Sequence, residues 1–428
     1  MKNNKKESLI WRRLDNSAKI YPLSTGRRYS TVFRLSVLLK EDINPKILQD
    51  SLNETLEKYK SFKVRLKKGF FWHYLENNPK LPIVEEEKEY PCKYIEPSLN
   101  RGYLFKVTYF KNKINIDIFH ALTDGNSGFI FFKEIIYTYL NKCYPKELAN
   151  ENKRIIKIED NTEDSYVRNY NKNFSFNTVI KSAYKLRGKK LRLGAVSAIH
   201  EIINIEELKN ETKKYDVTIT QYLTAVLIYS IYQANYIKGN SKKSIKICIP
   251  VNLKKYFPSN TMSNFYSYII IEADMRDKKL DTFEKILQFV KDEFVRQLQE
   301  EEVLKTMSGN VKFANNAIVK VVPLLLKIAL VRMAYLKIRR NFTTTYSNIG
   351  RVGIIGNYKN YIDNFLMLIA PASYERIKCT SCTYEDKIEY TFTSILNDNK
   401  IEKYFYNFLK DRGIEIQVES NGVLDDIS

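Results

Sequence analysis

The N-terminal part of the chain alternates between the hydrophobic periods of strands and helices. The apolar run "YSTVFRLSVLL" (Tyr29–Leu39) predicts a strand, and "NPKILQDSLNETLEKYKSF" places apolar residues three and four apart, as in an amphipathic helix. "FKVRLKKGFFWHYLE" alternates on both sides of Gly69, which predicts a hairpin. "YLFKVTYF" and "INIDIFH" predict a second hairpin, with "KNK" as its turn.

The period changes from two to 3.6 across the segment "HALTDGNSG". The isoleucines of "INIDIFH" alternate with other residues, which places His120 on the isoleucine face at the end of the strand. Apolar residues from Phe129 to Leu140 then form a helical stripe, and we expect Asn126 or Ser127 to cap that helix. The segment is therefore a loop between a strand and a helix, where catalytic residues are often found.

The second half repeats this alternation after a polar linker. The segment Lys146–Asn173 is rich in charged residues and asparagine, and it is the best linker candidate. Beyond it we expect a strand at "AVSAIHEIINI", two helices separated near Asp216, strands at "SIKICIPVNL" and "SNFYSYIIIEADM", and one long helix over Leu280–Val303. Strands and helices that alternate on both sides of a linker predict an α/β protein with two similar halves.

The segment Ala317–Ile338 is the most apolar of the chain. It contains four basic residues, whereas a membrane-spanning helix needs about twenty apolar residues with few charges, so we predict no transmembrane segment. Five apolar residues recur three and four positions apart: Val321, Leu324, Ile328, Val331 and Tyr335. This stripe predicts a basic amphipathic helix whose apolar side is mostly buried, with peripheral membrane contact as a less favoured alternative.

Composition supports a globular protein of the cytoplasm. Of the 428 residues, 44% are hydrophobic and 13% aromatic, which excludes a disordered chain. The N-terminus has no apolar core of a secretion signal, and five scattered cysteines do not form a disulfide framework. The net charge of +21 comes from lysines spread along the chain, so we do not expect nucleic acid as a partner. A basic surface would suit a co-substrate that carries phosphate.

Most motifs that would announce a particular chemistry are missing. "CTSC" (Cys379–Cys382) has no second cysteine pair and lies in a strand-like run, so we expect no zinc site or other metal centre. "GRVGIIG" does not have the glycine spacing of a dinucleotide site. Neither a phosphate-binding loop nor a serine-nucleophile elbow is present.

His120 and Asp124 remain as candidates. The chain has three histidines, and we interpret His73 and His200 as structural residues of strands. An imidazole is the side chain whose unperturbed pKa suits proton transfer near neutral pH. At the end of a strand, a nearby carboxylate could orient the ring, and Gly125 could leave room for a substrate.

Several segments resemble the chloramphenicol-acetyltransferase-like superfamily, which includes peptide-synthetase condensation domains. "HALTDGNSGFIFFKEIIYTYL" resembles its H-x-x-x-D-G motif and following helix, and "IPVNLKKYFPSNTMSNF" resembles its "PVNLR…GNF" segment. "WRRLDNSAKIYP" and the basic helix followed by "TTTYSNIGRV" are similar to the alcohol O-acetyltransferase group, the one the chain resembles most. The chain lacks the D-F-G-W-G motif of the plant acyl-CoA-dependent acyltransferases of this superfamily. Thr220-Gln221 stands where the wax ester synthases have an "ND" pair.

The resemblance implies two halves, residues 1–175 and 176–428, each with a mixed sheet and flanking helices, packed as a V around a central tunnel. It implies an acyl group, most simply acetyl, transferred from acyl-CoA to a small-molecule alcohol or amine without a metal. His120 would be the general base, and Asp124 would fix the loop through an arginine. Gly125 would keep the tunnel open. Three residues of the second half would approach the substrate, although for Tyr346 packing in the strand is an equal alternative: Tyr346, Ser347 and Asn348.

Two other functions stay open. One is a non-catalytic binding or scaffolding protein with the same fold, which has no need of the intact His120, Asp124 and Gly125. The other is a peripheral membrane enzyme that acylates a lipid or a glycan through the basic helix around Lys320 and Lys337.

Overall fold

The computed structural model describes residues 11–27, 30–151, 159–174, 181–237, 241–277, 280–314 and 321–424. The predicted boundary between the halves, at residues 175 and 176, lies outside these ranges, and so does the segment 317–320 of the basic helix. The boundary stays a prediction.

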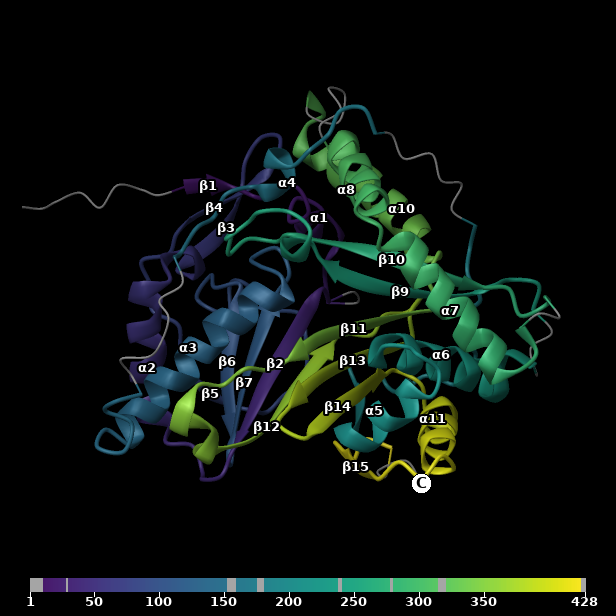
Figure 1. Cartoon of the computed structure of the whole chain (residues 1–428). Helices are drawn as coiled ribbons and strands as arrows, with labels where there is room; N and C mark the ends of the chain where they lie inside the picture. Colours follow the sequence, from purple (N-terminus) through teal and green to yellow (C-terminus); the bar gives the residue numbers. More distant parts are fainter. Residues whose placement is uncertain are drawn as a thin grey trace, which may run out of the picture.

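The N-terminal half is built on a five-stranded sheet with helices on one face. In spatial order its strands are β12 (Ile362–Ile369), β2 (Val32–Leu39), β7 (Lys113–Phe119), β6 (Phe105–Phe110) and β5 (Glu85–Glu86). The helices α2 (Pro45–Lys58) and α3 (Gly125–Cys143) pack together and cover this sheet (Figure 1). A small sheet of β1 (Trp11–Arg13), β4 (His73–Asn77) and β3 (Val64–Lys68) lies beside it.

The C-terminal half is built on a seven-stranded mixed sheet. Its strands are β10 (Tyr266–Ala273), β9 (Ile245–Asn252), β11 (Thr344–Arg351), β13 (Ile377–Tyr384), β14 (Lys387–Ser394), β8 (Ser197–Asn204) and β15 (Ile416–Ser420). Its helices are α5 (Ile205–Lys213), α6 (Ile219–Ile231), α7 (Phe283–Gln297), α8 (Glu300–Ala314), α10 (Leu324–Arg339) and α11 (Lys400–Lys410). Two short helices are α1 (Tyr21–Ser24) and α4 (Ser165–Arg168). The α/β class and the two mixed-sheet halves are confirmed; a tunnel between them stays a prediction.

One strand joins the two sheets. β12 follows β11 of the seven-stranded sheet in sequence, pairs with β2 of the five-stranded sheet, and is followed by β13 of the seven-stranded sheet again. Side chains of the larger sheet also donate to the β12 backbone: Cys382 Sγ to the Phe365 carbonyl (3.1 Å) and Thr393 Oγ1 to the Ile369 carbonyl (2.7 Å). The halves therefore share a strand, and the five-stranded sheet is completed by residues from the C-terminal part of the sequence.

The local predictions for the motif segment need one correction. The two predicted hairpins form, as β3–β4 and β6–β7. The cap of α3 is Asp124, not Asn126 or Ser127, because the Asp124 carboxylate accepts from the Ser127 backbone N–H at 2.9 Å. Gly128 has a separate role: a Cβ here would lie 2.9 Å from Ile118 Cδ1, so glycine lets α3 approach the sheet closely.

One prediction about helices was wrong, and another holds only in part. The expected long helix over Leu280–Val303 is two helices, α7 and α8, with a break between them. In α10 the predicted stripe is partly buried: Leu324 is buried, Ile328 and Val331 are half-buried, and Val321, just before the helix, is 66% exposed. The side chain of Tyr335 lies outside the described residues. Lys327 is instead buried, with 2% of its surface exposed. Helix α10 has apolar side chains on more than one side. The predicted stripe therefore does not determine which side of the helix packs against the core.

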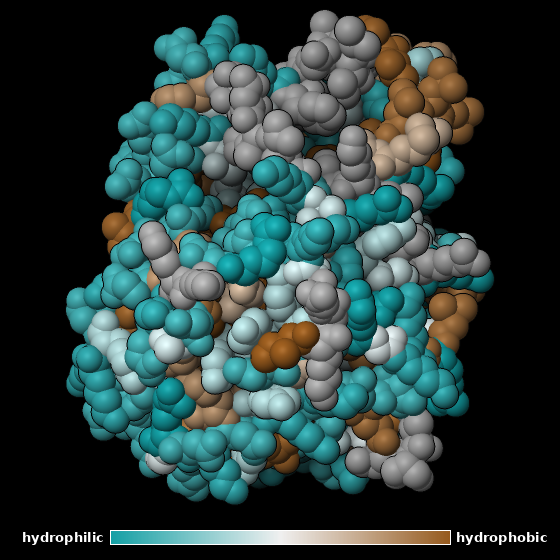
Figure 2. All heavy atoms as spheres, turned by 90° about the vertical axis from the view of Figure 1, so that its right-hand side faces the viewer, coloured by the Kyte–Doolittle hydropathy of each residue, from teal (hydrophilic) through white to brown (hydrophobic). Residues whose placement is uncertain are grey.

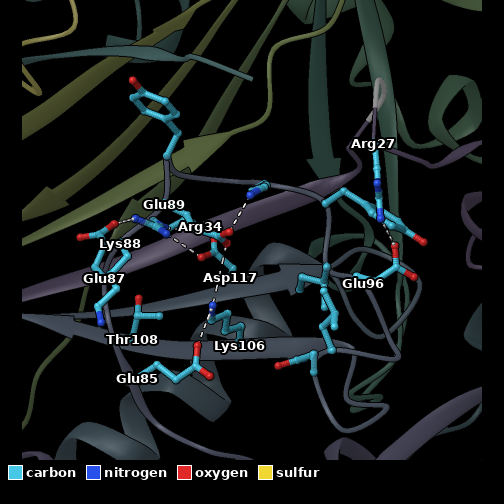
Figure 3. A pocket seen from close by; sticks show the side chains of 16 residues that line it. Arg27, Arg34, Glu85, Glu87, Lys88, Glu89, Glu96, Lys106, Thr108 and Asp117 are labelled. Atoms are coloured by element: carbon cyan, nitrogen blue, oxygen red, sulfur yellow. Dashed lines mark hydrogen bonds and ion pairs between the residues drawn. The ribbon is translucent and has the colours of Figure 1, made fainter. Parts of the chain in front are cut away.

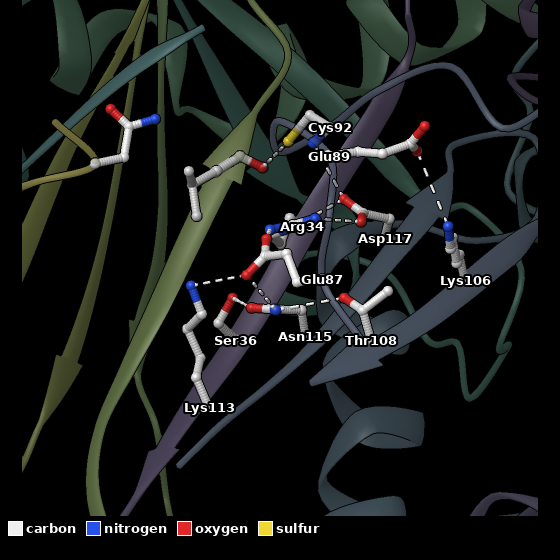
Figure 4. Close-up of polar contacts among 12 residues, drawn as sticks. Arg34, Ser36, Glu87, Glu89, Cys92, Lys106, Thr108, Lys113, Asn115 and Asp117 are labelled. Atoms are coloured by element: carbon white, nitrogen blue, oxygen red, sulfur yellow. Dashed lines mark hydrogen bonds and ion pairs between the residues drawn. The ribbon is translucent and has the colours of Figure 1, made fainter. Parts of the chain in front are cut away.

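A buried ion pair lies on the sheet face opposite α2 and α3. Arg34 of β2 faces Asp117 of β7, donating from Nε to Oδ1 (3.0 Å) and from Nη2 to Oδ2 (2.6 Å), and it also pairs with Glu87 (Figure 4). Arg34 and Asp117 are 4% and 6% exposed. They also line a cavity of about 510 Å³, whose other charged residues are largely paired (Figure 3). His120 is not among the residues that line it.

We expect Asp117→Asn to lower the free energy of unfolding by about 3 kcal/mol, because it removes one of the two carboxylates that pair with the buried Arg34 guanidinium. Lys58→Met is the matched control, since Lys58 pairs with Glu54 and Glu134 at the surface. It should change stability by less than about 1 kcal/mol. Urea titrations measure both. Equal, small effects for the two variants would contradict a structural role for the Arg34–Asp117 pair.

Candidate active site

The imidazole of His120 is held among aromatic rings just beyond the end of β7. Tyr21 of α1 stacks on it, with ring centroids 4.7 Å apart and planes at 17°. Tyr266 of β10 lies 5.3 Å away, and Phe33 of β2 contacts the ring edge-on at 5.2 Å. These contacts come from both halves, so the histidine lies where the halves meet and its ring has little freedom to rotate.

A chain of polar side chains begins at His120 Nδ1. The Oδ1 atom of Asn264 lies 3.0 Å from this nitrogen. The other end of the same amide donates from Nδ2 to Asp15 Oδ2 at 2.9 Å, and the Asn264 backbone N–H donates to that carboxylate as well, at 3.1 Å. Asn264 and Asp15 are both buried. Asp15, Asn264 and His120 thus form a relay that spans the two halves.

The relay fixes the tautomer of the neutral histidine. An ionised carboxylate only accepts hydrogen bonds, so the Asn264 amide must direct its NH₂ group to Asp15 and its oxygen to His120. That oxygen requires a proton on Nδ1, which leaves Nε2 with the free lone pair. Burial raises the pKa of Asp15 to about 6, while its hydrogen bonds from Asn264 oppose the rise, so Asp15 is ionised at neutral pH.

The charge state of His120 is set by competing influences. Burial, the largest influence, lowers its pKa below the ordinary value of 6.5. The Asp124 carboxylate and the hydrogen bond to Asn264 act in the opposite direction. The ring is therefore neutral at neutral pH and able to accept a proton at Nε2.

Asp124 is turned toward the backbone of the second half. Its Oδ1 caps α3 at Ser127, and its Oδ2 accepts from the Phe265 backbone N–H at 2.8 Å. The cation near it is Lys254, which donates to Ser127 Oγ (2.9 Å) and to the Thr261 carbonyl (2.6 Å) and interacts electrostatically with Asp124. Among the described contacts of Asp124, backbone amides and a lysine thus take the place of the arginine that the resemblance implied.

The remaining predicted residues are dispersed around the site. Gly125 begins α3, and a Cβ there would make ordinary contacts with Met367 Cε (3.6 Å) and Ile349 Cδ1 (3.7 Å). The loop therefore meets β11 and β12 at this position. A substrate-binding role of Gly125 stays a prediction.

The three candidates on β11 have different surroundings. Tyr346 is fully buried, and its hydroxyl lies 2.9 Å from Ser381 Oγ, which favours the packing alternative. Asn348 Nδ2 donates to Thr220 Oγ1 at 2.9 Å, at the start of α6. Ser347 is half-buried on the strand between them. The role of all three toward a substrate stays a prediction.

Sequence reasoning missed the residues that orient His120. Asp15 and Asn264 lie within segments that resemble the family, "WRRLDNSAKIYP" and "IPVNLKKYFPSNTMSNF", but neither has a local pattern that signals a contact with His120. Their separations in sequence from their partners, 249 residues for Asp15–Asn264 and 144 for Asn264–His120, explain why. Tyr21 and Tyr266 gave no signal either.

The other histidines and the cysteines offer no comparable site within the described residues. His73 is buried, which lowers its pKa to about 4, and His200 of β8 contacts Thr391 Oγ1 at 2.9 Å. Burial raises the pKa of all five cysteine thiols, so none is poised as a thiolate. In the part of the chain that the structure describes, no group of three or more His, Cys, Asp or Glu side chains is placed to hold a metal ion.

The chain is similar to one protein family and to many solved structures. The alcohol acetyltransferase family matches residues 195–367, and no curated protein matches the chain. Polyketide synthase associated protein 5 from Mycobacterium tuberculosis has a similar structure, with a TM-score of 0.62 and 11% identity over 93% of this chain and 96% of that one.

Two fungal structures are similar over nearly their whole length. TRI3 trichothecene 15-O-acetyltransferase from Fusarium sporotrichioides gives a TM-score of 0.62 at 9% identity, covering 94% of both chains. TRI101 of F. sporotrichioides, complexed with coenzyme A and T-2, gives 0.63 at 9% identity, covering 95% of this chain and 99% of that one. At such identities the likeness shows the fold. The chain therefore has the fold of these structures, which the condensation domain of the Monacolin K polyketide synthase also shares, and its residues 195–367 match the alcohol acetyltransferase family.

Proposed function

We propose that the protein is an acyltransferase that moves an acyl group, most simply acetyl, from acyl-CoA to the hydroxyl of a small molecule. The observation that carries the proposal is the orientation of His120, whose Nδ1 faces Asn264 so that Nε2 is the basic nitrogen. The match to the alcohol acetyltransferase family supports it, as does the likeness to TRI101, whose structure contains coenzyme A.

In this mechanism Nε2 of His120 takes the proton of the acceptor hydroxyl as its oxygen attacks the thioester carbonyl. The tetrahedral intermediate then collapses, the C–S bond breaks, and the same proton passes from Nε2 to the leaving thiolate. Asp15 and Asn264 keep the ring in the productive tautomer throughout and stabilise the imidazolium that forms between the two steps. Asp124 positions the loop and does not itself exchange a proton.

Direct attack in a ternary complex needs no acyl-enzyme. The buried thiols, with their raised pKa values, argue against a cysteine nucleophile. An amine acceptor would require the same base, so acceptor identity is a matter for assay. The direct test is thiol release with acetyl-CoA and longer acyl-CoAs against a panel of alcohols and amines. Absence of release with every pair would favour a non-catalytic binding protein.

We expect His120→Ala to fold normally and to lose turnover by about a hundredfold or more, the range of general-base catalysis. His200→Ala is the control, because His200 lies in β8 and contacts Thr391, not the candidate site. It should retain turnover. The thiol-release assay and a melting curve report both properties, and near-normal turnover of a folded His120→Ala protein would refute the assignment.

We expect Asn264→Ala to lower kcat/KM by about tenfold or more, the equivalent of one hydrogen bond of about 1.5 kcal/mol. Because the Asn264 hydrogen bond raises the pKa of His120, its loss should also move the acid limb of the pH–rate profile to lower pH. The wild-type limb should already lie below pH 6.5, since burial lowers this pKa. Asn260→Ala, in the same loop but exposed and bonded to Glu159, is the control. An unchanged limb in Asn264→Ala would contradict the relay.

We expect Asp124→Asn to lower stability by about 1–3 kcal/mol together with activity. Both Asp124 oxygens accept from buried backbone N–H groups, and the NH₂ of asparagine would leave one of these without an acceptor. Thermal unfolding and turnover are measured on the same preparation. Full stability with abolished activity would show instead that Asp124 acts directly on His120.

A further inference from the structure

Helix α10 presents a second apolar stripe to solvent. Leu326, Leu330 and Met333 recur four and three residues apart, which places them on one side of the helix, and they are 62%, 55% and 62% exposed. Leu324 on the inward side is buried. An amphipathic helix that only packs on a core has polar residues on its outer side. We therefore expect the outward stripe to contact a partner.

The tip of the β3–β4 hairpin extends this stripe. The Leu324 backbone N–H donates to the Phe70 carbonyl at 2.9 Å, and Lys327 Nζ donates to the Phe71 carbonyl at 2.9 Å. Phe70 is 73% and Phe71 42% exposed. The hairpin tip and the start of α10 are thus held together, and we refer to their exposed apolar side chains as the α10 surface: Phe70, Phe71, Leu325, Leu326, Leu330 and Met333.

The α10 surface lies at one end of the molecule. Figure 2 shows brown, apolar side chains gathered at its upper right, at the same end where Figure 1 places α8 and α10. Trp72, one of only two tryptophans in the chain, follows Phe71 and has Lys327 Nζ 3.6 Å from the centre of its ring. A tryptophan beside exposed Phe and Leu side chains is typical of proteins that lie at a membrane surface.

The charge of the surrounding sequence has one sign. Helix α10 itself contains four Lys and Arg residues and no Asp or Glu, and Arg340 follows it directly. The hairpin tip is preceded by Lys67 and Lys68. Apolar side chains within a basic region are complementary to a bilayer with anionic headgroups, which attract the cations while the acyl region accepts the apolar side chains.

We propose that the α10 surface docks the protein on the surface of an anionic membrane. None of the helices that the structure describes combines the length and the apolar character needed to cross a bilayer, so the contact is peripheral. A second copy of the chain is disfavoured as the occupant because two equally basic regions would repel each other. Nucleic acid is disfavoured because leucine, phenylalanine and methionine side chains have no charge or hydrogen-bond donor for a phosphate group.

The surface is distinct from the candidate active site but close to it in the fold. Arg332 of α10 donates from Nε to the Leu23 carbonyl of α1 at 3.1 Å, and α1 also carries Tyr21, which stacks on His120. The rings that surround His120 in the described structure belong to Tyr21, Phe33 and Tyr266, none of which is part of the α10 surface. Docking and acyl transfer can therefore be tested separately, and failure of one does not imply failure of the other.

The test is co-sedimentation of the full chain with vesicles of phosphatidylcholine alone and of phosphatidylcholine with phosphatidylglycerol. We expect binding to the anionic vesicles, weakened but not abolished by salt, and a blue shift of tryptophan fluorescence. The triple variant Phe70→Ser, Leu325→Ser, Met333→Ser changes only exposed side chains and should reduce vesicle affinity by about tenfold or more. The control is Leu193→Ser, whose side chain is 90% exposed elsewhere in the C-terminal half.

Each result decides the proposal. Affinity lost in the triple variant and kept in Leu193→Ser, with both variants melting like the parent protein, supports docking through the α10 surface. Equal binding by the parent and the triple variant, or no binding to anionic vesicles, overturns it. Analytical ultracentrifugation tests whether a second copy of the chain binds the α10 surface instead. A dimer that the triple variant abolishes, without vesicle binding by the parent protein, would show that the surface joins two copies.

Discussion

The site depends on two buried carboxylates that hold one loop of the opposite half. Asp15 accepts from the backbone N–H of Asn264, and Asp124 accepts from that of the next residue, Phe265. Buried backbone N–H groups must be paired. If the loop with Asn264 and Phe265 moved away, two buried N–H groups and the carboxylates of Asp15 and Asp124 would lose their partners in an interior that does not solvate them. Because the same loop carries the amide that meets His120, the constraint that joins the halves also orients the histidine.

This arrangement separates two roles that the sequence motif alone does not distinguish. Asp124 lies four residues after His120 and influences its pKa, yet both of its oxygens are engaged by backbone amides. The orienting carboxylate for the ring is instead Asp15, acting through Asn264. A carboxamide between the carboxylate and the imidazole transmits direction without placing a full charge against the ring, which keeps the histidine neutral and basic.

The parts of the fold that sequence predicted are those determined by local periodicity. The alternating isoleucines before His120 and the stripe after Gly125 gave the strand, the loop and α3 correctly. Local periodicity could not identify the residue that caps α3, because Asp, Asn and Ser are all good caps. The hydrogen bond from the Phe265 backbone N–H, a tertiary contact, favours Asp124. The break between α7 and α8 has no glycine or proline to announce it, and β12 is placed in the other half's sheet by pairing with β2, which no local pattern encodes.

The central claim is that neutral His120 carries its proton on Nδ1 and leaves Nε2 free as the base. Because the chain has only three histidines, ¹⁵N-histidine labelling with assignment by the His73, His120 and His200 variants can identify its ring nitrogens. At neutral pH we expect nitrogen chemical shifts and couplings of the Nδ1–H tautomer for His120. A ring protonated on Nε2 instead would contradict this claim, since neither the Asn264 contact nor a proton transfer at Nε2 could then be as described.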